Sequence, residues 1–272
     1  MSDDKSLVGG ASVGIADRLR ALRRFTPARI ALGRAGPGQP TEANLRFMLD
    51  HARARDAVHA AADFDSIERA WRAKGWSVLR VQSAAPDRGA YLKRPDLGRR
   101  LSPDSRARLA QRTDSCDVVI VAADGLSALA VEKAFAPVLD PLLPLLQGRG
   151  LAIGPLVLVE QGRVAIGDEI GELVRAKLAV VLIGERPGLS AADSLGAYIT
   201  WAPRIGAMDS ERNCISNIRP GGLSFEDGAA QIADIVGLAF AQAMTGVRLN
   251  DLRSAAAQAS SEAHGRLRLG DP

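Results

Sequence analysis

Two apolar segments of the sequence end in polar residues whose types suit ligand binding. An unbroken apolar run over residues 178–183 ends in a glycine and a charged turn, and a second short segment covers residues 213–218. Runs without polar alternation are typical of strands buried in parallel sheets, and ligands of open α/β sheets bind beyond the carboxyl ends of the strands. We therefore predict that the two segment ends form one wall of a crevice, although two ordinary strand–loop junctions would give the same pattern. The wall residues would be Glu185, Arg186, Cys214, Asn217 and Arg219.

Motifs that would make the chain a complete enzyme by itself are missing from the sequence. The glycines of residues 33–38 have the wrong order for a dinucleotide fingerprint, and no predicted strand precedes them. Residues 125–129 begin like the nucleophile elbow of a hydrolase but lack its last glycine. His51 and His59 are too far apart on one predicted helix to share a metal ion. The sequence predicts no catalytic set and no metal site, as expected of a subunit that completes another chain's active site.

The composition limits the class of protein. The 272 residues are 47% hydrophobic and 24% charged, which is typical of a soluble globular chain, and no apolar run approaches the roughly 18 residues of a membrane span. No secretory signal opens the sequence, and two distant cysteines favour a reducing cytosol over a disulfide framework. A net charge of +4 would suit nucleic acid, but the arginines are spread along the chain without an aromatic ladder. We expect neither a membrane nor a nucleic-acid partner.

Strands and helices alternate along the chain from about residue 76. This alternation predicts an α/β domain with a Rossmann-like, doubly wound and mostly parallel sheet. The predicted strands cover residues 76–82, 116–122, 151–160, 178–184 and 213–218. The predicted helices cover residues 42–61, 66–74, 103–112, 168–177 and 226–244, together with a long apolar helix after residue 127 that Pro137, Pro141 and Pro144 would fragment.

The N-terminal part of the chain has a different pattern. Ile15, Leu19 and Leu22 recur at helical spacing among arginines, which predicts a basic amphipathic helix that either packs on its own domain or serves for docking or targeting. The mixed charges from Arg29 to Asp56 would suit a polar subunit interface. The predicted parts are a flexible or targeting segment over 1–25, an N-terminal helical domain over 26–73, an α/β ligand-binding domain over 74–247 and a loose tail over 248–272.

Six longer motifs carry a resemblance to a known family. They read TPARIALGRAG at residues 26–36, DHARARDAVH at 50–59, YLKRPDLGRRL at 91–101, ADGLSA at 123–128, IGERPGL at 183–189 and RNCISNI at 212–218. In this order, and over about residues 24–245, the chain closely resembles the small (light) subunit of ethanolamine ammonia-lyase. The resemblance implies an adenosylcobalamin-dependent radical lyase that converts ethanolamine to acetaldehyde and ammonia. It also implies a hetero-oligomer in which a large subunit holds the substrate, often inside a bacterial microcompartment.

The resemblance also implies which residues bind the cofactor. Carried over residue by residue, the family's small-subunit cobalamin contacts fall on Val164, Glu185 and Cys214. Glu185 would accept hydrogen bonds from corrin amides or a ribose hydroxyl, and the other two would act through backbone groups or packing. The Asp-x-His-x-x-Gly motif of some cobalamin proteins is absent, since His51 follows Asp50 directly, so the cofactor's dimethylbenzimidazole is expected to stay on cobalt. A stand-alone cobalamin-binding or scaffold module without lyase activity is the alternative to the enzyme subunit.

Overall fold

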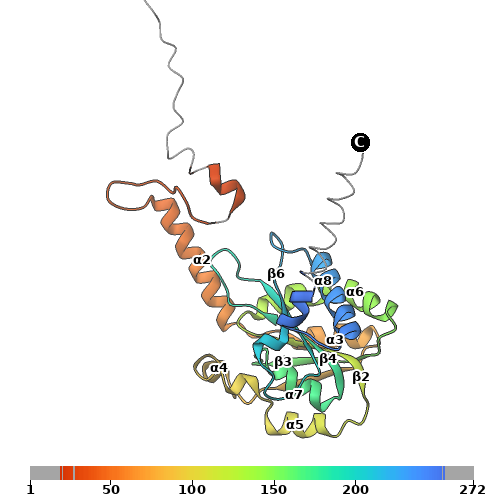
Figure 1. Cartoon of the computed structure of the whole chain (residues 1–272). Helices are drawn as coiled ribbons and strands as arrows, with labels where there is room; N and C mark the ends of the chain where they lie inside the picture. The colour runs from red at the N-terminus through yellow and green to blue at the C-terminus, as the bar shows by residue number, and fades with distance from the viewer. Residues whose placement is uncertain (1–18, 20, 27, 253, 255–272) are drawn as a thin grey trace, which may run out of the picture.

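The structure is a computed structural model of the chain and describes residues 19, 21–26, 28–252 and 254. In this part of the chain, a six-stranded sheet of order β1-β3-β2-β4-β5-β6 lies between two layers of helices (Figure 1). The α/β prediction is therefore confirmed. The strands are β1 (Val78–Gln82), β2 (Cys116–Ala123), β3 (Ile153–Glu160), β4 (Ala176–Gly184), β5 (Leu195–Trp201) and β6 (Arg212–Ile218). The helices are α2 (Thr41–His59), α3 (Phe64–Ala73), α4 (Arg88–Lys93), α5 (Pro103–Ala110), α6 (Ala128–Gly148), α7 (Ile166–Leu173) and α8 (Phe225–Gln242), with short 3₁₀ helices η1 (Leu22–Phe25), η2 (Leu97–Arg99) and η3 (Asp209–Glu211).

The direction of the strands changes near one side of the sheet. β1, β3, β2 and β4 pair in parallel, whereas β5 is antiparallel to both β4 and β6. The prediction of a mostly parallel sheet is wrong, because a loop over 185–194 returns the chain directly beside β4 without a crossover helix. The sheet is mixed, its Rossmann-like arrangement is not confirmed, and β5 is missing from the predicted strands. The other five strands lie close to their predicted bounds.

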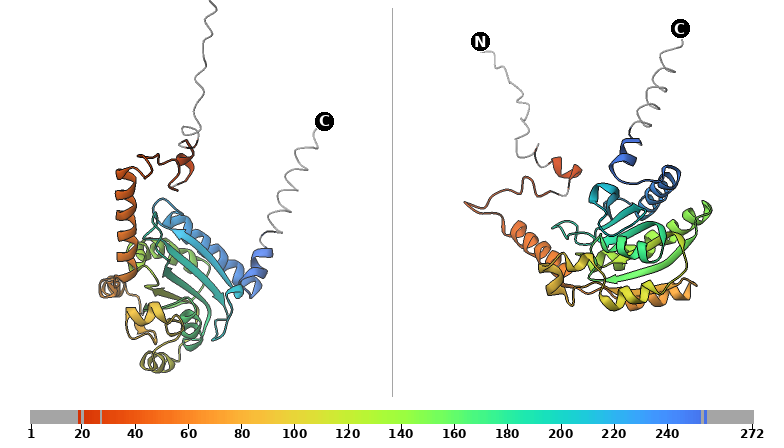
Figure 2. Two further views of the ribbon diagram at one scale, coloured as in Figure 1. Left: turned by 90° about the vertical axis from the view of Figure 1, so that its left-hand side faces the viewer. Right: turned by 60° about the horizontal axis from the view of Figure 1, so that its bottom comes forward.

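Alternate side chains of the strands face different helix layers. Val118 and Ile120 pack in the core formed with α3, α6 and α8, whereas Val119 and Val121 face α5 and α7. Figure 2 shows α6 and α8 together against one face of the sheet. Since both faces of the central strands are buried, these strands have no polar side, which explains the apolar runs in the sequence.

Helix α6 runs unbroken from Ala128 to Gly148, so the prediction that three prolines fragment it is wrong. Pro137 and Pro144 are exposed and Pro141 is half-buried, whereas the opposite side of the helix is buried against the sheet and α8. On the outer side, carbonyl groups that lose an amide partner to proline remain accessible to water. The packed inner side therefore keeps the helix continuous.

Helix α2 projects from the α/β body, whereas α3 belongs to it (Figures 1 and 2). Ala57 is the one buried residue of α2, but α3 places Phe64 and Trp71 in the same core as the strands. An N-terminal helical domain over 26–73 is thus not confirmed, and the boundaries at 73/74 and 247/248 stay predictions.

Two further expectations concern the ends of the chain and the absence of membrane-spanning helices. Residues 15–18 and 20 of the predicted basic helix and most of the C-terminal tail lie outside the described residues, and the described part of the basic segment contains the short helix η1. Within the described residues, every helix is too short or too polar to cross a membrane.

Candidate functional site

Five strands, β2 to β6, have one end at the same border of the sheet, where the carboxyl ends of the parallel strands lie. This border is called the sheet edge below. The carboxyl ends of β2, β3 and β4 meet there because these strands are parallel, and Ala123 is level with Ile183. β5 runs the other way, so its first residue, Leu195, pairs with Gly184 at the end of β4 and with Ile218 at the end of β6. The loops after four strands and the loop before β5 therefore share one edge, where ligands of α/β proteins bind.

A cavity of about 420 Å³ opens at this edge. Its walls come from α4, the loop after β2, the turn after β3, the end of β4 and the middle of β5. The lining residues are Tyr91, Gly125, Leu126, Arg163, Val164, Ile183, Gly184, Glu185, Arg186 and Tyr198. Val164 and Glu185 thus line the cavity, and Cys214 lies beside it as the cross-strand neighbour of Tyr198. The fold brings the three predicted site residues to one place, while their role in cobalamin binding stays a prediction.

The Glu185 carboxylate is fixed by three hydrogen bonds. The hydroxyl groups of Ser194 and Ser216 each donate to it at 2.5 Å, and the backbone amide of Asn217 donates at 3.2 Å. These bonds join the end of β4 to the following loop and to β6. Gly196 leaves space for the side chain, since a Cβ atom there would lie 3.0 Å from Glu185 Oε1. Glu185 is therefore a pre-positioned hydrogen-bond acceptor at the cavity wall.

Cys214 and Tyr198 form a neutral part of this wall. Cys214 is exposed, but the atoms around its thiol exclude enough water to raise the pKa of the thiol. Burial, with the neighbouring Cys214, raises the pKa of Tyr198 as well. Both groups are protonated at pH 7, so Cys214 is not an activated thiolate. They can pack against a ligand or hydrogen-bond to it, but they add no charge to the site.

The buried Asp124 holds the turn over 161–164 in place. Its carboxylate accepts hydrogen bonds from the backbone amides of Gln161 and Gly162 at 3.0 and 3.1 Å, and Arg88 Nη1 lies 3.6 Å away. Burial raises the pKa of Asp124 to about 6, although the amide of Gln161 and the charge of Arg88 lower it in part. The aspartate of the motif at 123–128 therefore does not line the cavity but fixes the backbone of the turn that carries Arg163 and Val164.

Two glycines let the loop after β2 touch the end of β4. Gly125 has a left-handed φ of 57°, and a Cβ atom there would overlap with the carbonyl oxygen of Gly184. A Cβ atom on Gly184 would likewise overlap with the carbonyl oxygen of Ser127. Because both approaches are backbone against backbone, neither position accepts a side chain without movement of the cavity wall.

The remaining residues of the predicted wall have separate roles. Arg186 lines the cavity, Asn217 binds Glu185, and Arg219 donates to the side chain of Asn217 at 2.7 Å. Within the described residues, no group of three His, Cys, Asp or Glu side chains could hold a metal ion. His51 and His59 are exposed on α2 and do not line the cavity.

Sequence reasoning misses several residues of the site. They are Tyr91, Arg163, Ser194, Tyr198 and Ser216. Arg163 stands directly before Val164 in the turn after a predicted strand, and this position is the signal that could have identified it. Tyr91 and Ser216 lie in the motifs at 91–101 and 212–218, and this membership is the signal that could have identified them. Ser194 and Tyr198 depend on β5 and on contacts between distant segments, for which the sequence shows no pattern.

Comparison with known proteins identifies the family. The family model described as ethanolamine ammonia-lyase light chain (EutC) matches residues 16–250. The chain belongs to this family. Relatives named ethanolamine ammonia-lyase small subunit include a protein of Azotobacter vinelandii (strain DJ / ATCC BAA-1303), which is 52% identical over 234 residues that cover 85% of this chain and 87% of the relative.

Two further proteins named ethanolamine ammonia-lyase small subunit have a similar sequence identity to this chain. The protein of Xanthomonas campestris pv. campestris (strain B100) is 48% identical over 239 residues, which cover 86% of this chain and 88% of the relative. The protein of Rhodopseudomonas palustris (strain BisA53) is 52% identical over 234 residues, which cover 86% of this chain and 90% of the relative. The predicted resemblance is confirmed, and the chain is a small subunit of an ethanolamine ammonia-lyase. The alternative of a stand-alone binding or scaffold module is not supported.

Proposed function

We propose that this chain completes the adenosylcobalamin site of an enzyme that converts ethanolamine to acetaldehyde and ammonia, while a large subunit holds the substrate. The observation that carries the proposal is the cavity at the sheet edge, where Val164, Glu185 and Cys214 lie together. The bound cofactor supplies the radical chemistry. The residues of this chain bind and orient the cofactor, which agrees with the lack of a catalytic set in the sequence.

The size and chemistry of the cavity fit part of a cobalamin. Drug-sized ligands fill roughly 300–1,000 Å³, so a cavity of about 420 Å³ can hold only one portion of this much larger cofactor. Glu185 offers a fixed acceptor for the N–H groups of corrin amides, Tyr198 offers a hydroxyl group, and Val164 offers an apolar contact. Another chain must cover the rest of the cofactor, as expected of a site between two subunits.

We propose that the dimethylbenzimidazole of the cofactor stays on cobalt. The two histidines in the described part of the chain are exposed on α2 and lie away from the cavity lining. Electron paramagnetic resonance of cob(II)alamin bound to the complex tests this directly. Labelling this chain with ¹⁵N-histidine should leave the nitrogen splitting unchanged, and an altered splitting would show that one of its histidines binds cobalt.

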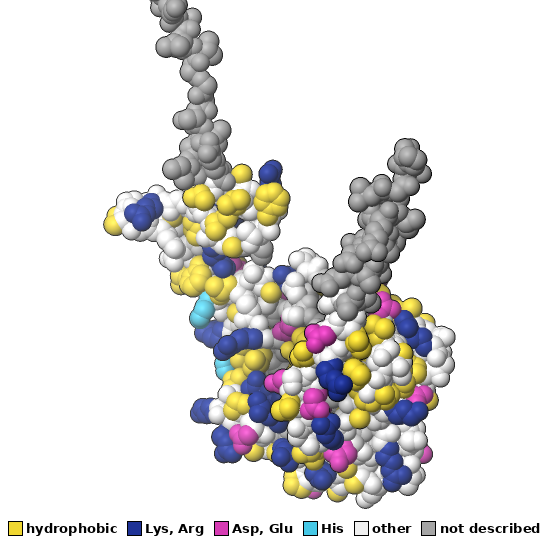
Figure 3. Space-filling view, in the orientation of Figure 1, with side chains coloured by type: hydrophobic (Ala, Val, Ile, Leu, Met, Phe, Trp, Pro, Cys, Tyr) yellow, Lys and Arg dark blue, Asp and Glu magenta, His cyan; other side chains and the backbone are white. Residues whose placement is uncertain are grey.

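The partner surface is proposed to lie on α2. Its outer side exposes Leu45, Met48 and Leu49 at 59%, 58% and 49%, and such a group of apolar side chains on one helix marks an interaction site. Figure 3 shows hydrophobic side chains (yellow) over the region of α2 at the upper left, with Lys and Arg side chains (dark blue) nearby. On the inner side, a groove of about 960 Å³ separates α2 from the loop over 189–193.

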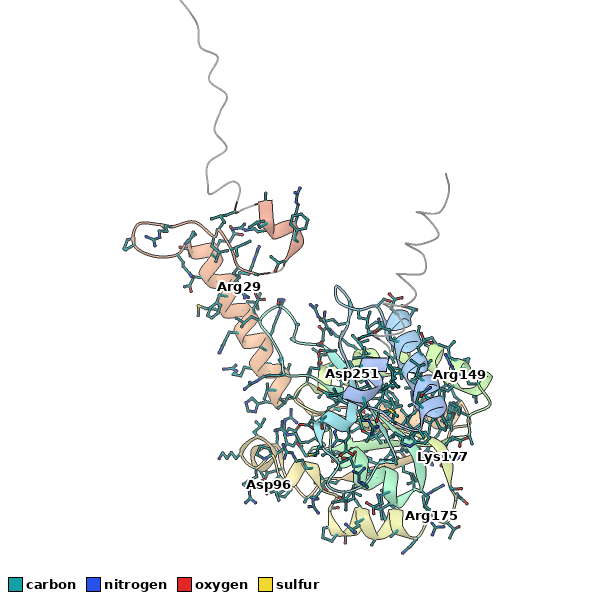
Figure 4. All side chains as sticks on the ribbon, in the orientation of Figure 1. Arg29, Asp96, Arg149, Arg175, Lys177 and Asp251 are labelled. Atoms are coloured by element: carbon teal, nitrogen blue, oxygen red, sulfur yellow. The ribbon has the colours of Figure 1, made fainter. Side chains whose placement is uncertain are left out.

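Arg29 lines this groove and connects α2 to the loop on the other side. Arg29 donates to Asp50 on α2 at 2.6 Å and to the carbonyl oxygen of Leu189 at 3.5 Å, and Figure 4 labels Arg29 beside α2. This chain therefore presents an apolar helix face and a preformed groove, which we assign to the large subunit.

We further propose that the assembly is packaged in a bacterial microcompartment and that the basic N-terminal segment directs it there. The support is the family and the basic amphipathic pattern of residues 15–25. Removal of residues 1–20 should leave the lyase active but unpackaged in cell fractionation. Unchanged packaging would contradict the role of this segment.

The proposed function is tested by reconstitution from separately purified subunits. With adenosylcobalamin and ethanolamine, acetaldehyde should form only when this chain and the large subunit are both present. Glu185→Gln should raise the Kd for adenosylcobalamin by about tenfold, since a hydrogen bond to a charged group contributes about 1.5–3 kcal/mol. Glu226→Gln, at an exposed position on α8, is the matched control. Full activity of the large subunit alone would refute the proposal.

A further inference from the structure

The cavity has more positive than negative charge in its lining. Arg163 and Arg186 line it, and Glu185 is the one carboxylate among the described residues that do so. The Glu185 oxygens already accept three hydrogen bonds from β6 and the loop before β5. The ion pairs formed between described residues include neither Arg163 nor Arg186. The cavity therefore offers two arginine side chains to an anion.

Arg163 is held in a fixed position and uses little of its hydrogen-bonding capacity. Its guanidinium lies 4.2 Å from the centre of the Tyr91 ring, and Nη2 makes one long hydrogen bond of 3.3 Å to the carbonyl oxygen of the same residue. Its Nε is buried and has no hydrogen-bond partner. A Cβ atom on Gly98 would lie 2.8 Å from Arg163 Cγ, so the glycine of the motif at 91–101 makes room for this side chain.

Arg88 contacts the same aromatic ring, but its guanidinium has hydrogen-bond and ion-pair partners within the protein. Its guanidinium lies 4.7 Å from the centre of the Tyr91 ring. It donates to the carbonyl oxygens of Val58 at 2.6 Å and Gly125 at 2.8 Å, and the carboxylate of Asp124 lies 3.6 Å away. Arg88 has one buried nitrogen without a partner as well, but it does not line the cavity. Its charge is compensated by Asp124, whereas the charge of Arg163 is left for a ligand.

We propose that Arg163, together with Arg186 of the same cavity lining, binds the phosphodiester in the nucleotide loop of adenosylcobalamin. This inference rests on the proposed function of the cavity. The side-chain amides of the corrin ring are neutral, and the phosphodiester is the one anionic group of the cofactor. A planar guanidinium stacked on an aromatic ring presents its N–H groups in a fixed fork that matches two phosphate oxygens. The turn over 161–164 thereby sets which part of the cofactor enters the cavity of this chain.

The experiment measures cofactor binding to the reconstituted complex without turnover. Three ligands are titrated by the change in visible absorbance: adenosylcobalamin, adenosylcobinamide, which lacks the phosphate, the ribose and the base, and adenosylcobinamide phosphate, which keeps the phosphate but lacks the ribose and the base. Arg163→Gln should weaken binding of the two phosphate-bearing ligands by about 10- to 100-fold, as expected for the loss of a charged hydrogen-bonding partner. Binding of adenosylcobinamide should not change. Arg99→Gln, at an exposed position in η2, is the matched control and should change none of the three.

The outcomes separate this inference from the proposed function. If the unaltered complex binds none of the three ligands, the cobalamin site itself is wrong. If the complex binds them but Arg163→Gln weakens all three equally, or none, Arg163 does not bind the phosphate. Should the variant fail to assemble, the unaltered complex still decides, because adenosylcobinamide phosphate must bind more tightly than adenosylcobinamide, and the difference must shrink as salt is added. Equal affinities for these two ligands would overturn the inference.

Discussion

Replacing Gly125 by alanine should destabilise this protein much more than an ordinary glycine-to-alanine change. Gly125 has a φ of 57°, and an alanine in the left-handed region costs about 1–2 kcal/mol. Its Cβ atom would also lie under 3.0 Å from the carbonyl oxygen of Gly184 and from a side-chain carbon of Ile183. Overpacking of this kind costs about 1–3 kcal/mol more. We expect the free energy of unfolding to fall by about 2–5 kcal/mol.

A second glycine separates the two contributions. Gly75 has a φ of 85°, but no atom lies within 4 Å of the position of its Cβ. Gly75→Ala therefore carries the backbone strain without the overlap and should cost about 1–2 kcal/mol. Urea unfolding of the small subunit, followed by far-ultraviolet circular dichroism, measures both variants against the unaltered chain.

The comparison decides whether the backbone contact between Gly125 and Gly184 is as tight as the structure shows. Since Glu185 follows Gly184, a shift forced by Gly125→Ala should also raise the Kd for adenosylcobalamin in the complex, whereas Gly75→Ala should not. If Gly125→Ala costs no more than Gly75→Ala, the loop after β2 does not rest on the end of β4, and the argument that glycine pairs shape the cavity is refuted.

Three further predictions concern the core, the hydrogen bonds of Glu185 and α2. The pKa of Asp124 is raised from 3.8 to about 6, so the folded state binds more protons than the unfolded state between these values. The free energy of unfolding should therefore fall by about 2 kcal/mol from pH 4 to pH 6. Urea unfolding of Asp124→Asn should lack this contribution, and equal slopes would contradict it. Ser216→Ala should weaken adenosylcobalamin binding by several-fold through a mobile Glu185, measured by absorbance titration, and an unchanged Kd would mean that this hydrogen bond is dispensable. Met48→Asp should abolish co-purification with the large subunit without loss of stability, whereas Leu145→Asp, on an exposed part of α6, should retain it.

Much of the sheet could be predicted from the sequence because burial on both faces leaves an unmistakable pattern. The runs over 116–123 and 176–184 have no polar side, and their strands lie in the middle of the fold. The site could be predicted in part for a related reason. Once β4 and β6 are placed, the residues at their ends must lie near one edge, which is where Glu185 and Asn217 are found.

The failures have a common physical cause, which is that contacts between distant segments decide the local structure. β5 contains Gly196, a residue unfavourable in strands, because the Glu185 side chain occupies the space beside it. Helix α6 contains three prolines that are unfavourable in isolated helices, and its buried inner face keeps it intact. The two serines that donate to Glu185 follow no pattern of residue types that would predict this contact from the sequence. A single sequence shows the residue type at each of these positions but not the partner that makes it acceptable.

The proton-bearing groups at this edge suit the proposed role of the chain in cofactor binding better than a role in proton transfer. Cys214 and Tyr198 remain protonated because their pKa values are raised, and three of the roughly four acceptor positions of the Glu185 carboxylate are already filled. Asp124 titrates near neutrality but is buried behind the turn over 161–164. What remains for a ligand is a fixed acceptor, a shaped wall and the charge of two arginines. A surface of this kind favours one orientation of a large cofactor only if it is rigid. Two features provide that rigidity: the close backbone contact between Gly125 and Gly184, and the hydrogen bonds by which the buried Asp124 holds the turn over 161–164.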